Sequence, residues 1–386
     1  MKALSKRTVN FTDSVIRRMT RISQKYGAVN LSQGFPDFSP PRELLGRLAE
    51  VASLPHQYSI TWGAQNFREA LAEKQSRYMG FAIDPNLEVV VTCGSTEAMM
   101  CAMLAVCNPG DKVAVFSPFY ENYGADAILS GAEPVYVPLR PPAFDFDPDE
   151  LKSAFRQGVK ALILCNPSNP TGKVFKREEL DLIAQLAIQY DAYVITDEVY
   201  EHIVYAPHVH TYIASLPGMR ERTISCSSLS KTYSITGWRL GYIIAPPGII
   251  DIARKIHDFL TVGAAAPLQE AALVGLRFPQ SYYDDLLKTY TAKRELFLDG
   301  LRRIGLSFNE PQAAYYVLLD ISEFRYESDL DFCEDLAEKV GVGAVPGSSF
   351  FREPVNHLIR LHFAKAETTL TEALNRLQGI RKVFAQ

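Results

Sequence analysis

The sequence predicts an α/β protein in which a mostly parallel sheet is sandwiched by helices and followed by a smaller α/β C-terminal lobe. Short apolar strands alternate with helical patterns from about Arg42 onward. Apolar strands of this kind indicate a sheet buried on both faces, and the intervening helices indicate parallel crossovers. The chain has 386 residues and is 47% hydrophobic, which suits a large core.

Residues 1–40 predict an N-terminal arm and a first helix that packs on the small lobe. Val15, Ile16, Met19 and Ile22 fall on one face of that helix. The many basic residues among the first 25 superficially resemble a transit peptide, but no apolar signal core follows them. Nor does any apolar run approach the roughly 20 residues of a membrane span. We therefore expect a cytoplasmic protein.

Residues 41–280 predict the large domain. A β-branched strand at 88–92 ends near Gly94 and leads into a helix at 96–106. Further strands are expected at 112–116, 161–165, 193–196, 223–225 and 240–245. Residues 281–386 predict the small domain, with helices at 282–304 and 329–340 and strands at 315–319 and 358–363.

Charge and cysteine content exclude several classes of protein. A formal net charge of −4 argues against non-specific binding of nucleic acid, which requires a basic surface. The six cysteines are scattered without the paired spacing of a metal site or a disulfide framework. We expect no metal.

The segment from Ser227 to Gly241 places one lysine, Lys231, among hydroxyl residues between two predicted strands. An aldehyde cofactor needs a nucleophilic amine beside groups that hold its phosphate, and Ser228 and Arg239 suit that task. Taken alone, Lys231 is equally well interpreted as a solvated loop lysine.

Polar residues also follow other predicted strands. Asp197 and Tyr200 come after the strand at 193–196, where a carboxylate can pair with a pyridine nitrogen and a tyrosine with a ring hydroxyl. Two Asn-Pro dipeptides constrain the backbone around Asn169 and so fix the position of its side-chain amide. Ser95 and Thr96 begin a helix whose N-terminus suits a phosphate. Helix caps and ordinary turns use the same residue types, so none of these segments is specific alone.

Together and in this order, the four segments resemble those of the fold-type I aminotransferases of classes I and II, which use pyridoxal 5′-phosphate. The resemblance runs from about Val29 to the C-terminus. It is closest to the subgroup of kynurenine, glutamine and methionine aminotransferases, whose N-terminal motif is similar to the run NLSQGFPDF from Asn30 to Phe38.

The resemblance implies a role for each matched residue. Lys231 would carry the cofactor as a Schiff base, Asp197 would meet the pyridine nitrogen, and Tyr200 would meet the ring oxygen, which makes these three the catalytic set. The implied cofactor-binding residues are Ser95, Thr96, Tyr120, Asn169, Asp197, Tyr200, Ser228, Lys231 and Arg239. Tyr58 would reach the phosphate of the neighbouring subunit across the interface of a homodimer.

Arg360 matches the arginine with which this family binds the substrate carboxylate, and Gly34 and Asn169 would join it there. Arg360 alternates with apolar residues on the strand predicted at 358–363, so its side chain lies on the opposite face. A guanidinium can take a carboxylate through two parallel hydrogen bonds. The alternative is a structural salt-bridge arginine on a half-exposed strand.

The implied activity is a ping-pong exchange of the α-amino group between an amino acid and a 2-oxo acid. The subgroup favours large neutral side chains: methionine, glutamine, aromatic residues or kynurenine. This chain departs from its pattern at Ile16, where an aromatic residue is usual, and at 263–266, where Gly-Ala-Ala-Ala replaces a bulkier segment. At 313–316, Ala-Ala-Tyr-Tyr replaces the usual Gly-Thr-Tyr-Phe run.

Other activities stay open. No second arginine clearly marks a dicarboxylate pocket, yet aspartate-type aminotransfer is the first alternative. A carbon–sulfur β-lyase would use the same lysine, cofactor and carboxylate clamp. The cofactor-sensing domain of a transcription regulator is a non-enzymatic alternative, but the resemblance leaves no room for an N-terminal DNA-binding module.

Overall fold

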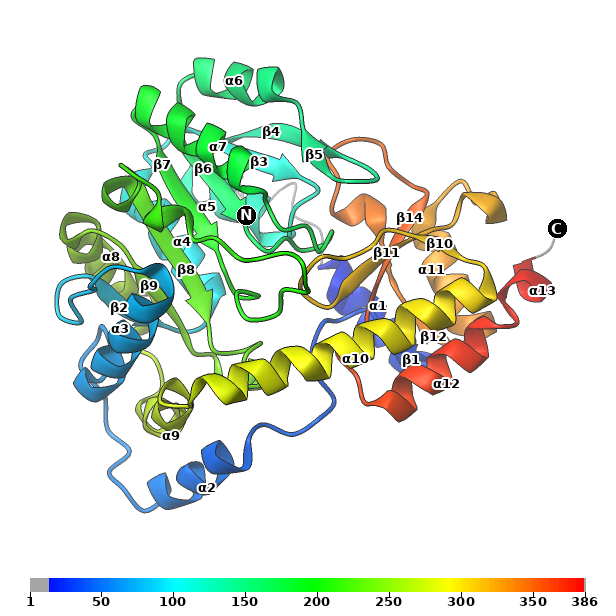
Figure 1. Cartoon of the computed structure of the whole chain (residues 1–386), viewed down its shortest axis with the longest axis horizontal. Helices are drawn as coiled ribbons and strands as arrows, with labels where there is room; N and C mark the ends of the chain where they lie inside the picture. Colours follow the sequence, from blue (N-terminus) through cyan, green and yellow to red (C-terminus); the bar gives the residue numbers. More distant parts are fainter. Residues whose placement is uncertain (1–13, 385–386) are drawn as a thin grey trace, which may run out of the picture.

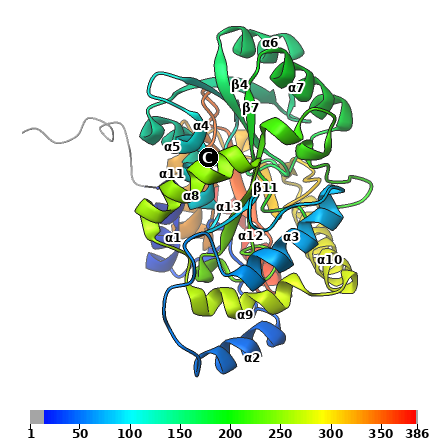
Figure 2. The ribbon, with the colours of Figure 1, turned by 90° about the vertical axis from the view of Figure 1, so that its left-hand side faces the viewer.

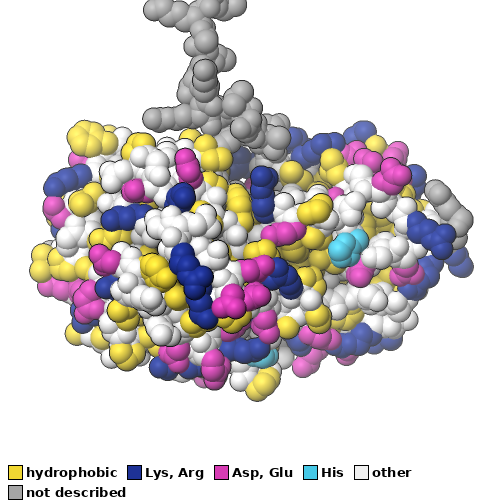
Figure 3. Space-filling view, turned by 90° about the horizontal axis from the view of Figure 1, so that it is seen from above, with side chains coloured by type: hydrophobic (Ala, Val, Ile, Leu, Met, Phe, Trp, Pro, Cys, Tyr) yellow, Lys and Arg dark blue, Asp and Glu magenta, His cyan; other side chains and the backbone are white. Residues whose placement is uncertain are grey.

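The computed structural model describes residues 14–384, which form a large sheet, a small sheet and a separate pair of strands, with helices packed around them (Figure 1). The first 13 residues of the predicted N-terminal arm and the last two of the chain lie outside the described residues. Within residues 14–384, no helix combines the length and apolar character needed to cross a membrane. On the face drawn in Figure 3, basic and acidic side chains of the described residues are intermingled.

The large sheet has eight strands in the order β2-β9-β8-β7-β6-β3-β4-β5. Their bounds are β2 Val89–Thr92, β3 Lys112–Ser117, β4 Glu133–Arg140, β5 Asp145–Phe146, β6 Val159–Cys165, β7 Tyr193–Asp197, β8 Thr223–Ser228 and β9 Gly241–Ile244. The strands β8, β7, β6, β3 and β4 are parallel, whereas β9 is antiparallel to both of its neighbours and β5 to β4. The prediction of a mostly parallel sheet is confirmed.

Helices cover both faces of this sheet because its strands are apolar on both sides. Leu162 and Leu164 pack with α6 and α7, while Ala161 and Ile163 pack with α4, α5 and α8. The helices of this part are α2 Arg42–Val51, α3 Gln65–Met79, α4 Ser95–Val106, α5 Asn122–Ser130, α6 Pro148–Arg156, α7 Arg177–Gln189, α8 Pro247–Thr261 and α9 Ala266–Leu276. Figure 2 shows α6 and α7 at one end of the molecule and α2 beside α9 at the other.

The small sheet is antiparallel, with the strand order β10-β11-β14-β13. Its strands are β10 Ser307–Phe308, β11 Tyr316–Asp320, β13 Val345–Pro346 and β14 Leu358–His362. The long helix α10, Gln280–Ile304, extends from beside α9 to α12, Glu367–Leu377 (Figure 1). The helix predicted at 329–340 is α-helical in α11, Asp329–Asp335, and continues as a π-helical turn over Leu336–Val340. The short helix α13, Ile380–Phe384, follows α12.

The N-terminal segment lies against this smaller part. The helix α1, Val15–Lys25, contacts β13 and α11, and strand β1, Val29–Asn30, pairs in parallel with β12, Val342–Gly343. Met19 of α1 and Leu31 are fully buried in the same core as α10 and α12. The division of the chain at residues 40 and 280 stays a prediction.

Candidate active site

A cavity of about 450 Å³ lies at the carboxyl ends of β6, β7 and β8. It is where parallel strands of an α/β sheet usually bind ligands. Of the residues singled out from the sequence, the cavity brings together Gly34, Ser95, Thr96, Tyr120, Asn169, Asp197, Tyr200, Ser228, Lys231, Arg239 and Arg360. Tyr58 does not line it. Segments from both sheets and from the N-terminal part thus converge on one site.

One end of the cavity is built to hold an anion. Ser95 and Thr96 form the first turn of α4, where backbone N–H groups have no helical partner. Arg239 lies directly against this turn, because a Cβ added to Gly94 would lie 2.4 Å from its Nη2 atom. Arg239 itself adopts a left-handed backbone conformation with φ of 53°. Such strain is usual at functional sites and requires support from the surrounding structure.

Lys231 lies in the connection between β8 and β9, with its amine inside the cavity. The Nζ atom donates a hydrogen bond of 3.1 Å to the backbone oxygen of Gly34. Burial lowers the pKa of Lys231, and neighbouring Arg360 and Arg239 lower it further, against opposing effects of Tyr316 and Asp197. A lowered pKa leaves more of the amine neutral and nucleophilic than in a solvated lysine. The structure therefore does not support the interpretation of Lys231 as a solvated loop lysine.

Asp197 is the last residue of β7 and is buried. Its Oδ2 atom accepts a hydrogen bond of 2.7 Å from the hydroxyl of Tyr123, a residue that no sequence motif indicated. Burial raises the pKa of Asp197, whereas the bonds from Tyr123 and the Val199 backbone and the charge of Lys231 lower it. A buried carboxylate in this position is suited to pair with a cationic group in the cavity.

Tyr200 and Asn169 line the same side of the cavity. The hydroxyls of Tyr200 and Tyr316 form a hydrogen bond of 2.9 Å. The Oδ1 atom of Asn169 accepts a hydrogen bond of 2.7 Å from Nη1 of Arg360, which leaves its amide N–H groups as donors. Tyr316 also lines the cavity, while Tyr315 packs in the core and donates to the oxygen of Gly34.

Arg360 is 1% exposed, so it is not the half-exposed arginine of the alternative interpretation. Its guanidinium donates to Asn169 and to the backbone oxygen of Ser32 at 3.0 Å, and it lies over the ring of Tyr316 at 4.2 Å. None of the described residues gives it an acidic partner, and its Nε atom has no hydrogen-bond partner. A buried cation without a counter-charge is costly, so this arrangement favours an anionic ligand.

The outer end of the cavity contains residues that the motifs did not indicate. Ser14, the N-cap of α1, and Ile16 and Arg17 of α1 line it together with Tyr120 and Glu121. The Ser14 hydroxyl donates to Oε1 of Glu121 at 2.5 Å. The guanidinium of Arg17 is exposed and forms no ion pair with another described residue. Arg17 thus lines the cavity in addition to Arg239 and Arg360.

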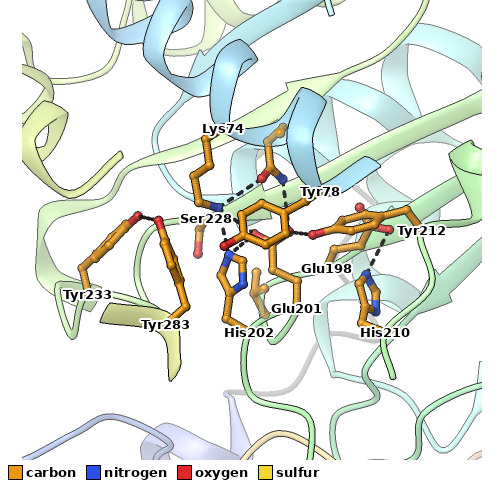
Figure 4. A network of polar contacts seen from close by, with 12 residues as sticks. Lys74, Tyr78, Glu198, Glu201, His202, His210, Tyr212, Ser228, Tyr233 and Tyr283 are labelled. Carbon is orange, nitrogen blue, oxygen red and sulfur yellow. Dashed lines mark hydrogen bonds and ion pairs between the residues drawn. The ribbon is translucent and has the colours of Figure 1, made fainter. Parts of the chain in front are cut away.

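A buried polar network supports the segment after Asp197 from behind (Figure 4). Lys74 of α3 lies 2.8 Å from Nε2 of His202 and 3.7 Å from Glu201. Glu201 also accepts hydrogen bonds from Tyr212, Gln75 and Tyr242. These contacts hold the residues that follow Tyr200 against α3 and β9, so their role is structural.

Tyr58 lies on the surface away from the cavity and is 86% exposed. It lines a separate hollow together with His56, Gln57 and the Gly-Ala-Ala-Ala segment at 263–266. Several exposed apolar side chains lie near this hollow in the chain: Leu54, Ile60, Phe259, Leu260 and Val262.

Comparisons with known proteins agree on one family. The model of the class I and II aminotransferases matches residues 26–377. Methionine aminotransferase of Escherichia coli (strain K12) is 37% identical over 369 residues, which cover 95% of this chain and 96% of that protein. Kynurenine–oxoglutarate transaminase 1 of Homo sapiens is 34% identical over 386 residues, with 91% and 92% covered.

Solved structures give the same result. The structure of N-succinyldiaminopimelate aminotransferase from Mycobacterium tuberculosis superposes with a TM-score of 0.93 at 36% identity, covering 97% of this chain and 99% of that one. The likeness thus extends over both sheets and the N-terminal segment. The chain therefore belongs to the class I and II aminotransferases, enzymes that use pyridoxal 5′-phosphate to transfer an amino group between an amino acid and a 2-oxo acid.

Proposed function

We propose that the cavity holds pyridoxal 5′-phosphate with Lys231 as its covalent attachment point. The observation that carries this proposal is that Lys231, Asp197, Arg239 and Arg360, from separate segments, line one cavity of about 450 Å³. The residues fit the cofactor: a nucleophilic amine for its aldehyde, a buried carboxylate for its ring nitrogen and an anion-binding end for its phosphate. Gly94 keeps that end open to Arg239, since any Cβ there would meet the guanidinium.

The surrounding side chains divide the remaining tasks. Ser95, Thr96, Ser228 and Arg239 would hold the phosphate, and Tyr120 would contact the cofactor ring. Tyr200 and the amide of Asn169 donate hydrogen bonds to the ring oxygen. Support comes from their common position on the cavity wall and from the hydrogen bond that orients the Asn169 amide.

The chemistry requires a proton to move at the substrate α-carbon. When bound, pyridoxal phosphate withdraws electrons from the α-carbon of the amino acid attached to it, which makes the α-proton acidic. The carboxylate of Asp197 keeps the ring nitrogen protonated and so maintains this withdrawal. The amine of Lys231 takes the α-proton as a general base and returns it as a general acid, for which its lowered pKa is suited.

The substrate α-carboxylate binds to Arg360. Its guanidinium is buried and without an acidic partner among the described residues, and Gly34 and Asn169 lie beside it. Two parallel hydrogen bonds to a carboxylate would supply the missing counter-charge. Because the carboxylate is fixed at this end, the side chain of the substrate points toward the outer end of the cavity.

The substrate side chain is large and neutral, as in methionine, glutamine, aromatic amino acids or kynurenine. Ile16, Phe35 and Tyr120 give the cavity apolar walls, and two of the relatives are named for methionine and kynurenine. Arg17 favours a second candidate, an acidic substrate of the aspartate type, because a free guanidinium at the outer end can bind a distal carboxylate.

A half-reaction screen separates these two candidates. The purified holoenzyme is mixed with single amino acids, and the conversion of the cofactor absorbance to that of the pyridoxamine form is followed. We expect methionine, glutamine or phenylalanine to react fastest, and Arg17→Gln to leave those rates unchanged. Fastest reaction with aspartate or glutamate, lost selectively in Arg17→Gln, would establish the acidic class instead. Absence of any half-reaction would contradict aminotransfer.

The enzyme works as a homodimer in which Tyr58 of each subunit completes the phosphate site of the other. Support comes from the 86% exposure of Tyr58 and from the exposed apolar side chains that adjoin, in the chain, the segments lining its hollow, among them Phe259 at 91%. Exposed apolar residues in such number usually mark an interaction surface.

The enzyme is cytoplasmic. Its six cysteines are all free in the structure, and most are buried. Unpaired cysteines are the rule in reducing compartments, whereas secreted proteins usually pair them.

A further inference from the structure

Tyr316 brings a hydroxyl group to the catalytic end of the cavity. It is the last residue of the run Ala-Ala-Tyr-Tyr at 313–316. Tyr316 begins β11, is 3% exposed and lines the cavity. Its hydroxyl lies tightly against Gly34, where an added Cβ would be 2.2 Å from the oxygen. The position of this hydroxyl is therefore fixed by packing.

The hydrogen bond between Tyr316 and Tyr200 has a direction once the cofactor is bound. The two oxygens are 2.9 Å apart, and the hydroxyl of Tyr315 lies close to both. A phenol has a single proton to donate. If Tyr200 donates its proton to the ring oxygen of the cofactor, its own oxygen is free to accept, and Tyr316 must be the donor.

We propose that Tyr316 is a positioning residue that orients and polarises the hydroxyl of Tyr200, so that Tyr200 binds the ring oxygen more strongly. This inference rests on the proposed function, because it requires Tyr200 to face the cofactor. Hydrogen bonds in a chain strengthen one another, so the donor bond from Tyr200 gains from the bond that it accepts.

The groups around Tyr200 keep its hydroxyl able to donate a hydrogen bond. The titratable and charged groups that face the two hydroxyls are Tyr120, Cys165, Asp197, Lys231, Tyr290, Tyr315 and Arg360. Burial raises the pKa of Tyr200 well above its ordinary value, with further contributions from Tyr315 and Tyr316. Tyr200 thus stays protonated and able to donate over the working pH range. Arg360 lies over the Tyr316 ring at 4.2 Å, which restricts movement of that ring.

The effect is measurable in the visible absorbance of the holoenzyme. The hydrogen bond from Tyr200 withdraws negative charge from the ring oxygen. That charge would otherwise stabilise a proton on the nitrogen that joins Lys231 to the cofactor. If the hydrogen bond from Tyr200 is weaker, the nitrogen holds its proton to higher pH, and the pH midpoint of the absorbance change rises. We expect Tyr316→Phe to raise the midpoint by about half a pH unit. Tyr200→Phe should raise it further.

A double-variant comparison tests whether Tyr316 acts through Tyr200. The midpoint of Tyr200→Phe/Tyr316→Phe should equal that of Tyr200→Phe alone. Tyr290→Phe is the matched control, because its buried hydroxyl has no hydrogen-bond partner and its loss should leave the midpoint unchanged. An unchanged midpoint in Tyr316→Phe, or a shift of the same size when Tyr200 is already phenylalanine, would overturn the inference. A wild-type enzyme without a titrating visible band would instead overturn the proposed function.

Discussion

The hydroxyl of Tyr123 donates a hydrogen bond of 2.7 Å to Oδ2 of Asp197, 74 residues further along the chain. Tyr123 lies on α5, three residues after Tyr120, and is 2% exposed. Burial alone would raise the pKa of Asp197, and the bond from Tyr123 is the first contribution that opposes it. Tyr123 therefore helps to keep this carboxylate ionised inside the protein.

Replacing Tyr123 by phenylalanine tests this relationship. Removing the donor raises the pKa of Asp197, so the acidic limb of the kcat profile should move to higher pH. A hydrogen bond to a charged group contributes about 1.5–3 kcal/mol, so kcat at neutral pH should fall about tenfold or more. The measurement is kcat against pH for wild type and Tyr123→Phe. Tyr136→Phe, a phenol outside the cavity, is the control, and an unshifted acidic limb in Tyr123→Phe would contradict the role.

Replacing Arg360 by lysine should selectively weaken the binding of amino-acid substrates. A lysine keeps the charge but loses the two parallel hydrogen bonds to a carboxylate. We expect kcat/KM for the preferred amino acid to fall about 100-fold, mainly through KM. Arg352→Lys, at an exposed position outside the cavity, serves as the control. Equal kcat/KM in Arg360→Lys and wild type would show that the carboxylate binds elsewhere.

The network behind the site predicts a loss of stability in acid. Burial and Lys74 lower the pKa of His202 to about 3. Burial alone would raise the pKa of Glu201, but Lys74 and His202 lower it to about 2. Both groups bind protons more readily when unfolded, so the stability that they contribute is complete above pH 6.5 and falls as pH drops toward these values.

Urea unfolding at two pH values measures this effect. Between pH 6.5 and pH 5, the titration of His202 should reduce the free energy of unfolding by about 2 kcal/mol. His202→Gln should lose that part of the pH dependence, whatever its stability at pH 7. His56→Gln is the control, since His56 is an exposed histidine. A pH dependence in His202→Gln as steep as that of wild type would contradict the assignment.

Placing a charge on the exposed apolar surface tests the homodimer. Phe259 is 91% exposed, and we expect Phe259→Asp to shift the protein toward the monomer, because a carboxylate is costly to bury in an interface. Sedimentation velocity measures the mass of each form. Ile188→Asp on α7, at a position that is 45% exposed, places a charge on a different surface and separates dissociation from misfolding. A wild-type protein that sediments as a monomer would rule out the shared phosphate site.

The sequence predicted those parts of the site that depend on local structure. Asp197 and Ser228 end β7 and β8, Asn169 lies in the loop after β6, and the apolar pattern of the strands was sufficient to predict their position at one edge of the sheet. Lys231 and Arg239 lie in a single connection between neighbouring strands. Resemblance then supplied the roles of Arg360 and Tyr58, which no local pattern determines.

Residues brought to the site by tertiary packing were missed. Tyr123 reaches Asp197 across 74 residues, and Tyr316 reaches Tyr200 across 116. In the sequence both look like ordinary aromatic core residues, because hydrophobic periodicity does not reveal where a phenol hydroxyl points. Arg17 is one of many basic residues near the N-terminus, and only the folded structure shows that it lines the cavity. The sequence also did not predict that the small sheet is antiparallel, because pairing between strands far apart in the chain determines that arrangement.

Reduction of the holoenzyme with borohydride, followed by proteolysis and mass spectrometry, decides whether Lys231 is the attachment point of the cofactor. We expect the peptide that contains Lys231 to carry the mass of a reduced pyridoxyl phosphate group, and the Lys231→Ala protein to carry none. A modified peptide containing a different lysine, or a wild-type protein with no stable modification, would contradict the assignment of Lys231.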